Sequence, residues 1–494
     1  MGDLLRTPSP EEAAALREVF AQREYTDHKL IEKLGAVDLP TRRTRNRPRL
    51  MRATRGGTPL DTLARLFLFS APVGEEAARE ALDPVPLELP RDLGLVELHG
   101  GEVVPQVVLY PYGRLLLTFD PPDLVAQGAP PDMVMGISSS TVDLERFTVR
   151  RPVRSALDIG TGCGFQGLLA AEHSERVWAV DYSPRAVNFA RFSAALSGLT
   201  HVECLEGDRF EPVRGRRFDL IVGNLPFVIA PSKRYLYRDG GMEADAFARS
   251  VIRSAPDYLE EGGLCQLICE WAHFAGRPWQ ERLEEWFAGS GCDVWVIELS
   301  STLPALYAEA WIRDTERDDP EVFARTYEEW TEWYEREGIE KVSTGLIAMR
   351  RRSGGRNWFH LDEWPDHPPA GFGKYVLQRF AGYDWLENAE TDGALLGARL
   401  AVDPGARLVA QNEWTAGGWH VTEARLCMAQ APAYAGAVNA HVVHLLGLLD
   451  GERTLRDAVA KLAAGTNVPF ERVAAPCVPL VRRLIERGFL VPKG

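Results

Sequence analysis

The feature that most constrains the fold of this chain is an alternation of short apolar runs with helical segments between about Met135 and Arg352. Such alternation is typical of parallel strands joined by crossover helices, and it predicts an α/β fold. The expected strands are Ser155–Ile159, Arg176–Asp181, Val202–Glu206, Phe218–Val222, Leu264–Ile268, Val294–Leu299 and Lys341–Arg351. The helices expected between the last two strands are Leu303–Arg313 and Pro320–Glu337.

A glycine-rich turn follows the first expected strand. It reads Asp158-Ile159-Gly160-Thr161-Gly162-Cys163-Gly164, and a helix is expected from about Phe165. A backbone that turns this sharply beside a ligand has no room for a Cβ, which is why glycine is favoured there. Dinucleotide-binding enzymes use a similar turn, so the turn alone does not identify the ligand.

Acidic residues end the next two strands. Asp181 closes the second strand, where a carboxylate can accept hydrogen bonds from both hydroxyls of a ribose. Asp208 follows the third strand, in Glu206-Gly207-Asp208-Arg209. Because the carboxyl ends of parallel strands meet at one edge of the sheet, this pattern predicts a nucleoside cofactor at that edge.

The fourth strand ends in Val222-Gly223-Asn224-Leu225-Pro226-Phe227. A planar amide or an exocyclic amine is a poor nucleophile because its lone pair is delocalised. If the Asn224 side-chain oxygen and the Leu225 carbonyl accept its hydrogens, the nitrogen is drawn towards tetrahedral geometry and its lone pair becomes available. Pro226 would fix the turn, and Phe227 would offer a flat face for a planar group.

The whole central segment resembles the class I S-adenosylmethionine-dependent methyltransferases, and Asn224–Phe227 resembles the Asn/Asp-Pro-Pro-Tyr/Phe signature of members that methylate amino groups. The resemblance implies a Rossmann-like, seven-stranded core that binds S-adenosyl-L-methionine. Leu225 departs from the signature, which usually has proline there, but it keeps the backbone carbonyl. The implied cofactor-binding residues are Asp158, Gly160, Thr161, Gly162, Gly164, Asp181, Tyr182, Asp208, Arg209 and Asn224. The implied catalytic residues are Asn224, Leu225, Pro226 and Phe227.

The segments that flank this core have a different pattern. Helical patterns and short strands favour mostly helical, winged-helix-like flanks. On the N-terminal side we expect helices within Pro10–Leu34 and Leu60–Leu82 and a hairpin of Leu93–Leu98 with Val103–Leu109. On the C-terminal side we expect helices at Asn439–Leu449, Leu455–Leu462 and Phe470–Arg487, and then a strand at Gly488–Val491. The expected domains are 1–130, 131–353 and 354–494.

The charge pattern bears on the partner. A net charge of −14 argues against indiscriminate nucleic-acid binding. The stretch from Thr41 to Arg55 departs from this, because it is rich in arginine and has no acidic residue. Its arginines are Arg42, Arg43, Arg45, Arg47, Arg49, Arg52 and Arg55. This basic arm, Arg42–Arg55, either binds phosphate bidentately or pairs with the acidic surface of the protein.

A basic and aromatic loop, Lys233–Arg238, follows the catalytic motif and continues to Gly240-Gly241. Aromatic residues among Arg and Lys suit a stacked base and its phosphates. The same loop resembles a segment of the enzymes that methylate release-factor glutamine. Phe227, the basic arm and the winged-helix-like flanks favour the exocyclic amine of a nucleobase as the substrate, with adenine in DNA or RNA preferred. The alternative is a protein glutamine amide, and a cofactor-binding protein without turnover is disfavoured because Asn224 and Asp181 are intact.

No metal site, disulfide or membrane span is expected. The seven cysteines, Cys163, Cys204, Cys265, Cys269, Cys292, Cys427 and Cys477, lie mostly in apolar runs, which favours reduced, buried thiols. His441 and His444 have no evident third ligand. No apolar run approaches the roughly 20 residues of a membrane helix. Glu11-Glu12 precede any apolar stretch, which is not how a secretory signal begins. We therefore expect a cytoplasmic protein.

Overall fold

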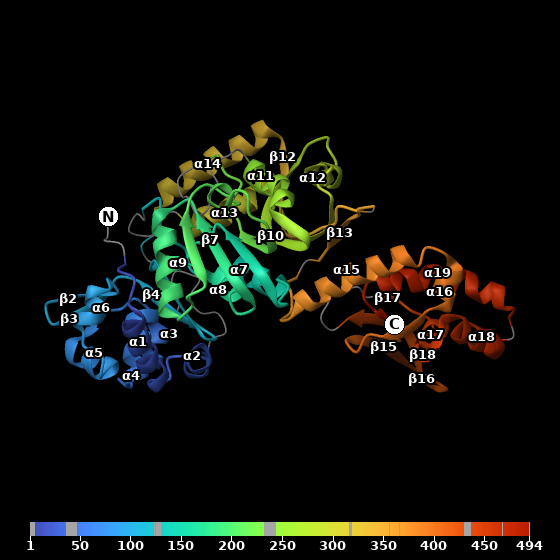
Figure 1. Ribbon diagram of the computed structural model, residues 1–494, viewed down its shortest axis with the longest axis horizontal. Coiled ribbons are helices and arrows are strands. Elements are labelled where there is room, and N and C mark those ends of the chain that lie inside the picture. The colour runs from blue at the N-terminus through green and yellow to red at the C-terminus, as the bar shows by residue number, and fades with distance from the viewer. Residues whose placement is uncertain are drawn as a thin grey trace. The chain divides into compact units, whose positions relative to one another are not determined.

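The computed structural model describes residues 5–35, 47–122, 124, 130–231, 244–315, 319–354, 356–364, 366–428, 436–466 and 468–493. The chain forms two compact units (Figure 1). One consists of Met1–Glu145 and Arg151–Pro365, and the other of Arg146–Arg150 and Asp366–Gly494. The expected N-terminal and central domains thus fall within the first unit, and the division into three domains stays a prediction.

An eight-stranded sheet forms the centre of the first unit. Its strands are β6 (Val153–Ile159), β7 (Ser174–Asp181), β8 (Val202–Glu206), β9 (Phe218–Asn224), β10 (Leu259–Phe274), β11 (Cys292–Thr302), β12 (Ile339–Arg351) and β13 (Phe359–Glu363). The strand order is β13-β11-β12-β10-β9-β6-β7-β8. Only β12 runs antiparallel to its neighbours β10 and β11 among these described strands. The expected Rossmann-like core is confirmed, and β13 is an edge strand that was not predicted.

Helices cover both faces of this sheet. The connecting helices are α8 (Phe165–Ala170), α9 (Pro184–Leu196), α11 (Ala246–Ser254), α12 (Trp279–Phe287), α13 (Pro304–Thr315) and α14 (Pro320–Glu337). On one face, Leu157 and Ile221 pack in a core with α11 and α12. On the other face, Ala179 packs with residues of α9. Successive side chains of a strand point to opposite faces, so these buried strands are apolar along most of their length.

The helix α14 has the bounds predicted from the sequence. The side chain of Asp319 accepts hydrogen bonds from the backbone N–H groups of Glu321 and Val322 at the start of the helix. Gly338 ends it with a left-handed backbone conformation at φ 67°. Local capping signals therefore fixed both ends of this helix.

The N-terminal part of the first unit is mostly helical. Its helices are α1 (Pro10–Gln22), α2 (Asp27–Leu34), α3 (Arg47–Ala53), α4 (Pro59–Leu63), α5 (Glu75–Leu82), α6 (Glu88–Asp92) and α7 (Ser139–Phe147). A small antiparallel sheet contains β1 (Val73–Gly74), β2 (Val96–His99) and β3 (Glu102–Pro105), and a hairpin contains β4 (Val108–Tyr112) and β5 (Leu115–Phe119). Phe20 of α1 and Phe192 of α9 belong to one hydrophobic cluster. The helical region therefore shares a core with α8 and α9, which connect strands of the large sheet.

The predicted N-terminal hairpin is correct in kind and wrong in its bounds. The expected second strand Val103–Leu109 is divided between β3 and β4. Pro105 ends β3, and it has no N–H with which to continue a ladder. β4 instead pairs with β5.

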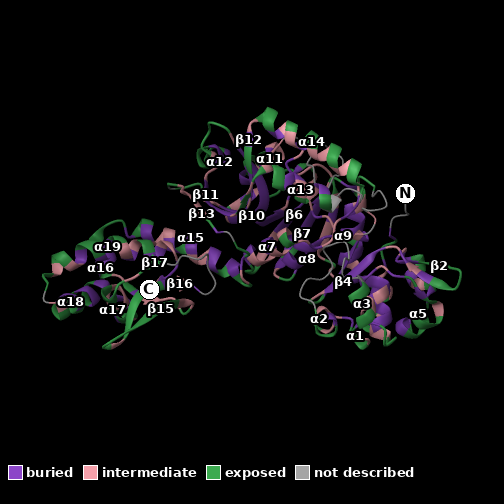
Figure 2. Ribbon diagram, turned by 180° about the vertical axis from the view of Figure 1, so that it is seen from behind, coloured by how far each residue is buried: buried purple, intermediate pink, exposed green. Residues whose placement is uncertain are grey.

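The second unit combines helices with two small sheets. Its helices are α15 (Phe372–Asn388), α16 (Asp392–Gly397), α17 (Ala440–Leu448), α18 (Leu455–Thr466) and α19 (Phe470–Glu486), and its first sheet contains β14 (Arg399–Val402), β18 (Asp450–Thr454) and β19 (Leu490–Lys493). The second contains β15 (Ala406–Thr415), β16 (Gly418–Met428) and β17 (Gly436–Ala437). Figure 2 shows β15 and β16 as a largely exposed ribbon. Within the described ranges, no helix has the length and apolar character needed to cross a bilayer.

Candidate active site

The glycine-rich turn between β6 and α8 has a left-handed backbone at three positions. The φ angles of Gly160, Gly162 and Gly164 are 69°, 54° and 91°. A Cβ at Gly164 would lie 3.2 Å from the Cα of Ala190, so packing also requires a glycine there. A Cβ at Gly162 would meet no described atom within 4 Å. The turn therefore leaves space beside Gly162, as a bound ligand requires.

Two carboxylates, the buried Asp158 and the half-buried Asp181, hold this turn. Asp158 Oδ2 accepts hydrogen bonds from Thr161 Oγ1 at 2.6 Å and from Gly167 N at 2.8 Å. Burial raises the pKa of Asp158 to about 6. Asp181 Oδ2 accepts a hydrogen bond from Gly162 N at 2.9 Å, and burial also raises the pKa of Asp181. Asp158 is 1% exposed, so its carboxylate shapes the turn from within the core.

The other predicted cofactor residues lie at the ends of β7 and β8. Gly207 N donates to Asp181 O at 2.9 Å, which joins the ends of these neighbouring strands. Both oxygens of Asp208 accept hydrogen bonds from the guanidinium of Arg209, at 2.9 and 2.6 Å. Tyr182, which follows β7, is 67% exposed. The structure thus brings the predicted acidic residues to one edge of the sheet.

Asn224 ends β9 and has an unusual hydrogen-bonding state. Its Nδ2 donates to Thr141 Oγ1 at 3.1 Å and to Ser140 Oγ at 3.4 Å. Its Oδ1 is buried and has no hydrogen-bond partner among the described residues. A buried acceptor without a donor costs about 1–3 kcal/mol. This oxygen is therefore placed to accept a hydrogen bond from a bound molecule.

The motif Asn224–Phe227 lies beside the glycine-rich turn Gly160–Gly164. A Cβ on Gly160 would be 3.8 Å from Pro226 Cδ and 3.9 Å from the Asn224 carbonyl oxygen. Leu225 is 2% exposed and packs in the core with Ile159. At this departure from the family signature, the leucine side chain fills the core. Phe227 is partly buried and contacts two hydrophobic clusters.

Sequence reasoning missed the residues that hold Asn224. Ser140 and Thr141 lie at the start of α7, and Gln166 of α8 donates its side-chain N–H to the Thr141 carbonyl at 2.9 Å. The run Ser138-Ser139-Ser140-Thr141 before a helical pattern is the available signal, since hydroxyl residues favour helix starts. That signal predicts a helix start without indicating that its hydroxyls reach Asn224.

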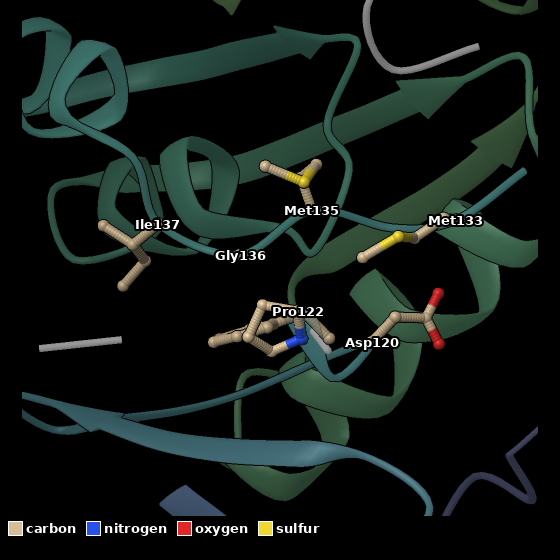
Figure 3. A pocket seen from close by; sticks show the side chains of 7 residues that line it. Asp120, Pro122, Met133, Met135, Gly136 and Ile137 are labelled. Atoms are coloured by element: carbon tan, nitrogen blue, oxygen red, sulfur yellow. The ribbon is translucent and has the colours of Figure 1, made fainter. Parts of the chain in front are cut away.

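A small hollow lies at the end of β5. It is lined by Phe119, Asp120, Pro122, Met133, Met135, Gly136 and Ile137 (Figure 3). Asp120 at its rim is already ion-paired with Arg185 of α9, and it accepts a hydrogen bond from Val134 N at 2.8 Å. Because no residue of the Asn224 motif lines this hollow, the candidate site is the sheet edge and not the hollow.

Part of the predicted partner surface lies outside the described residues. This holds for the loop Lys233–Arg238 and for Arg42, Arg43 and Arg45 of the basic arm. In the remainder of the arm, Arg49 donates to the Leu34 carbonyl at 2.6 Å, and Arg52 and Arg55 are exposed. Nucleic-acid binding by the arm stays a prediction.

Comparisons with known families agree with the geometry. Residues 138–288 match the family described as the methyltransferase small domain. The core thus has the class I methyltransferase fold. Class I methyltransferases of this kind use S-adenosylmethionine, and the open space at Gly162 and the carboxylates at the ends of β7 and β8 fit that cofactor. Residues 22–106 and 378–492 match two families described as domains of unknown function, DUF7059 and DUF7782.

Curated relatives are similar to about a quarter of this chain. The release factor glutamine methyltransferase of Xylella fastidiosa (strain 9a5c) is 37% identical over 123 residues, which cover 22% of this chain and 44% of that protein. The enzyme of the same name from Geobacter sulfurreducens is 34% identical, with 27% and 51% covered. The ribosomal protein uL3 glutamine methyltransferase of Bradyrhizobium diazoefficiens is 35% identical, with 24% and 40% covered. The chain spans about half the length of these relatives.

Solved structures are more distant. The tRNA m1G37 methyltransferase of M. jannaschii has 13% sequence identity and a TM-score of 0.30, with 50% of this chain and 58% of that chain covered. Trm5b from Pyrococcus abyssi has 16% identity and a TM-score of 0.31, with 58% and 77% covered.

Proposed function

We propose that this chain transfers a methyl group from S-adenosyl-L-methionine to the side-chain amide nitrogen of a protein glutamine. The observation that carries the proposal is the buried Oδ1 of Asn224, which lies beside the glycine-rich turn and has no hydrogen-bond partner in the described part of the chain. The glutamine methyltransferases that match the domain support a glutamine amide as the acceptor.

The arrangement around Asn224 suits an amide acceptor. Thr141 and Ser140 accept hydrogen bonds from Asn224 Nδ2, so the amide plane is held with Oδ1 towards the acceptor. Asn224 Oδ1 and the Leu225 carbonyl would each accept one N–H of the glutamine amide. This draws the nitrogen towards tetrahedral geometry and orients its lone pair. Phe227 would stack on the planar amide.

The bound cofactor supplies an electrophilic methyl group on a sulfonium. In the proposed transfer, the glutamine nitrogen would form the new N–C bond as the S–C bond breaks, the sulfur would leave as the neutral thioether of S-adenosylhomocysteine, and the nitrogen would release one proton to solvent. Because the two acceptor oxygens orient the lone pair, the reaction at Asn224 needs no strong base. The hydrogen-bonding demands of a nucleobase amine are the same, which is why the motif leaves both substrates open. The names of the relatives favour the glutamine amide over the nucleobase amine that was predicted from the sequence.

Methyl transfer from a labelled cofactor tests this proposal. The purified protein is incubated with tritiated-methyl S-adenosylmethionine and separate DNA, RNA and protein fractions. We expect label in protein, at glutamine when the labelled peptide is sequenced by mass spectrometry. The Asn224→Ala variant is the matched control and should give no label. Label in DNA or RNA alone, or label on another amino acid, would contradict the glutamine assignment.

A further inference from the structure

An inserted helical hairpin packs against the loop that follows the catalytic motif. The strands β11 and β12 are antiparallel neighbours, which a tight turn could join. Here α13 and α14 intervene instead, and they contact each other and β12 (Figure 1). The hydrophobic cluster between hairpin and loop contains Val228, Ile229, Ala272, Tyr307, Ala308, Ile312, Trp330, Tyr334, Ile339 and Val342. Phe227 packs at its margin.

Two tyrosines of the hairpin bind both backbone polar groups of Ile229. The N–H of Ile229 donates to Tyr307 Oη at 3.1 Å. The hydroxyl of Tyr334 donates to the Ile229 carbonyl at 2.7 Å. Ile229 is fully buried, so each of these groups would be unsatisfied without its tyrosine. Two separate helices thus fix the backbone two positions beyond Phe227.

A buried carboxyl orients the first of these tyrosines. Tyr307 Oη donates to Glu270 Oε2, and Thr344 Oγ1 donates to Glu270 Oε1 at 3.0 Å. Glu270 is 4% exposed on β10. Ile268, two residues before Glu270 on the same strand, pairs with Asn224 in the register of β9 and β10. Because the Tyr307 proton is directed to Glu270, a lone pair of Tyr307 faces the Ile229 N–H.

We propose that Tyr307 and Glu270 are positioning residues for methyl transfer. Glu270 fixes the Tyr307 hydroxyl, Tyr307 and Tyr334 fix Ile229, and the fixed loop holds Phe227 against the acceptor amide. This assignment rests on the proposed function, because it names what holds the acceptor side of the same site. No known step of the transfer uses Glu270 or either tyrosine directly.

The test compares single-hydroxyl variants in the full chain. Tyr307→Phe and Tyr334→Phe each remove one hydrogen bond to Ile229 and keep the ring. Tyr327→Phe is the matched control, since Tyr327 lies on α14 in the same cluster and its hydroxyl bonds to none of the described residues. Glu270→Ala removes the acceptor of Tyr307, whereas Glu270→Gln keeps one. Amide hydrogen exchange of peptides spanning residues 225–231 is measured together with kcat, KM and the cofactor Kd.

We expect Tyr307→Phe to speed exchange at Ile229 and to lower kcat about tenfold, with the cofactor Kd within about twofold of wild type. Glu270→Ala should also speed exchange at Ile229 and lower kcat. Glu270→Gln should bring the exchange rate and kcat most of the way back to those of wild type. If Tyr307→Phe has the same exchange rate at Ile229 and the same kcat as the control Tyr327→Phe, the proposal is overturned. The exchange measurement needs no acceptor, so faster exchange with no glutamine methylation would reject the proposed function alone. Normal exchange with glutamine methylation would reject the positioning role alone.

Discussion

Thr141 Oγ1 lies 3.1 Å from Asn224 Nδ2 and accepts its hydrogen bond, while Oδ1 of the same amide has no partner among the described residues. Among the described residues, the amide nitrogen of Asn224 is therefore hydrogen-bonded and its amide oxygen is not. An amide that is held by its nitrogen presents its oxygen in a single direction. This relationship links the start of α7 to the chemistry at the end of β9.

Replacing Thr141 by valine removes the hydroxyl and keeps the side-chain shape. We expect kcat to fall about tenfold because Asn224 is no longer held in one orientation, with cofactor affinity unchanged. Thr141→Ser keeps the hydroxyl and should retain most of the activity. Steady-state kinetics and calorimetric cofactor titration check this. Equal kcat in the valine and serine variants would show that the Thr141 hydroxyl does not orient Asn224 for catalysis.

Removal of the Asn224 side chain should separate catalysis from cofactor binding. Asn224→Ala takes away the acceptor oxygen, and we expect kcat to fall at least about a hundredfold. Cofactor affinity should stay close to that of wild type, because the turn from Gly160 to Gly164 is retained. Single-turnover transfer and calorimetry measure the two effects. Near-normal turnover by this variant would disprove the catalytic assignment.

Asp181→Ala should have the opposite profile. Asp181 accepts hydrogen bonds from the backbone N–H groups of Gly162 and Ser183, and its loss would loosen the cofactor turn. We expect the cofactor Kd to rise about tenfold or more, with a smaller effect on kcat at saturating cofactor. Glu203→Ala is a control, because that exposed carboxylate on β8 pairs only with Arg176 among the described residues. If both variants bind the cofactor equally well, Asp181 has no role in binding.

Glu270 should make stability depend on pH. Burial raises the pKa of Glu270 from 4.5 to about 8, so the folded state holds a proton that the unfolded state loses near its ordinary pKa. The free energy of unfolding should therefore fall as pH rises from about 5 to about 8. Glu270→Gln stays neutral, so its stability advantage over wild type should grow over this range. Denaturant titrations at several pH values measure this, and parallel pH profiles for the two proteins would contradict it.

Local signals allowed much of the core to be predicted. β8 and α14 have the predicted bounds because turn residues and caps mark their ends in the sequence. The glycine-rich turn and the position of Asn224 could also be predicted, because each belongs to a short motif at the end of a strand. Their shared sheet edge followed from the parallel order.

Features that depend on long-range contacts were not predicted. Thr141 reaches Asn224, and Tyr307 reaches Ile229 and Glu270, only because distant segments fold together. No periodicity or motif encodes such pairs. The ribbon β15–β16 was missed for another reason. Its strands are exposed on both faces, so they lack the alternation of apolar and polar residues by which a half-buried strand is predicted.

The proposed role of Asn224 can be tested by a crystal structure with S-adenosylhomocysteine and a glutamine-containing acceptor peptide. We expect the glutamine amide nitrogen within hydrogen-bonding distance of Asn224 Oδ1 and of the Leu225 carbonyl, and the cofactor product against Gly160–Gly164. An Asn224 side chain that faces away from both molecules, or a different nucleotide preferred at the glycine turn, would contradict it.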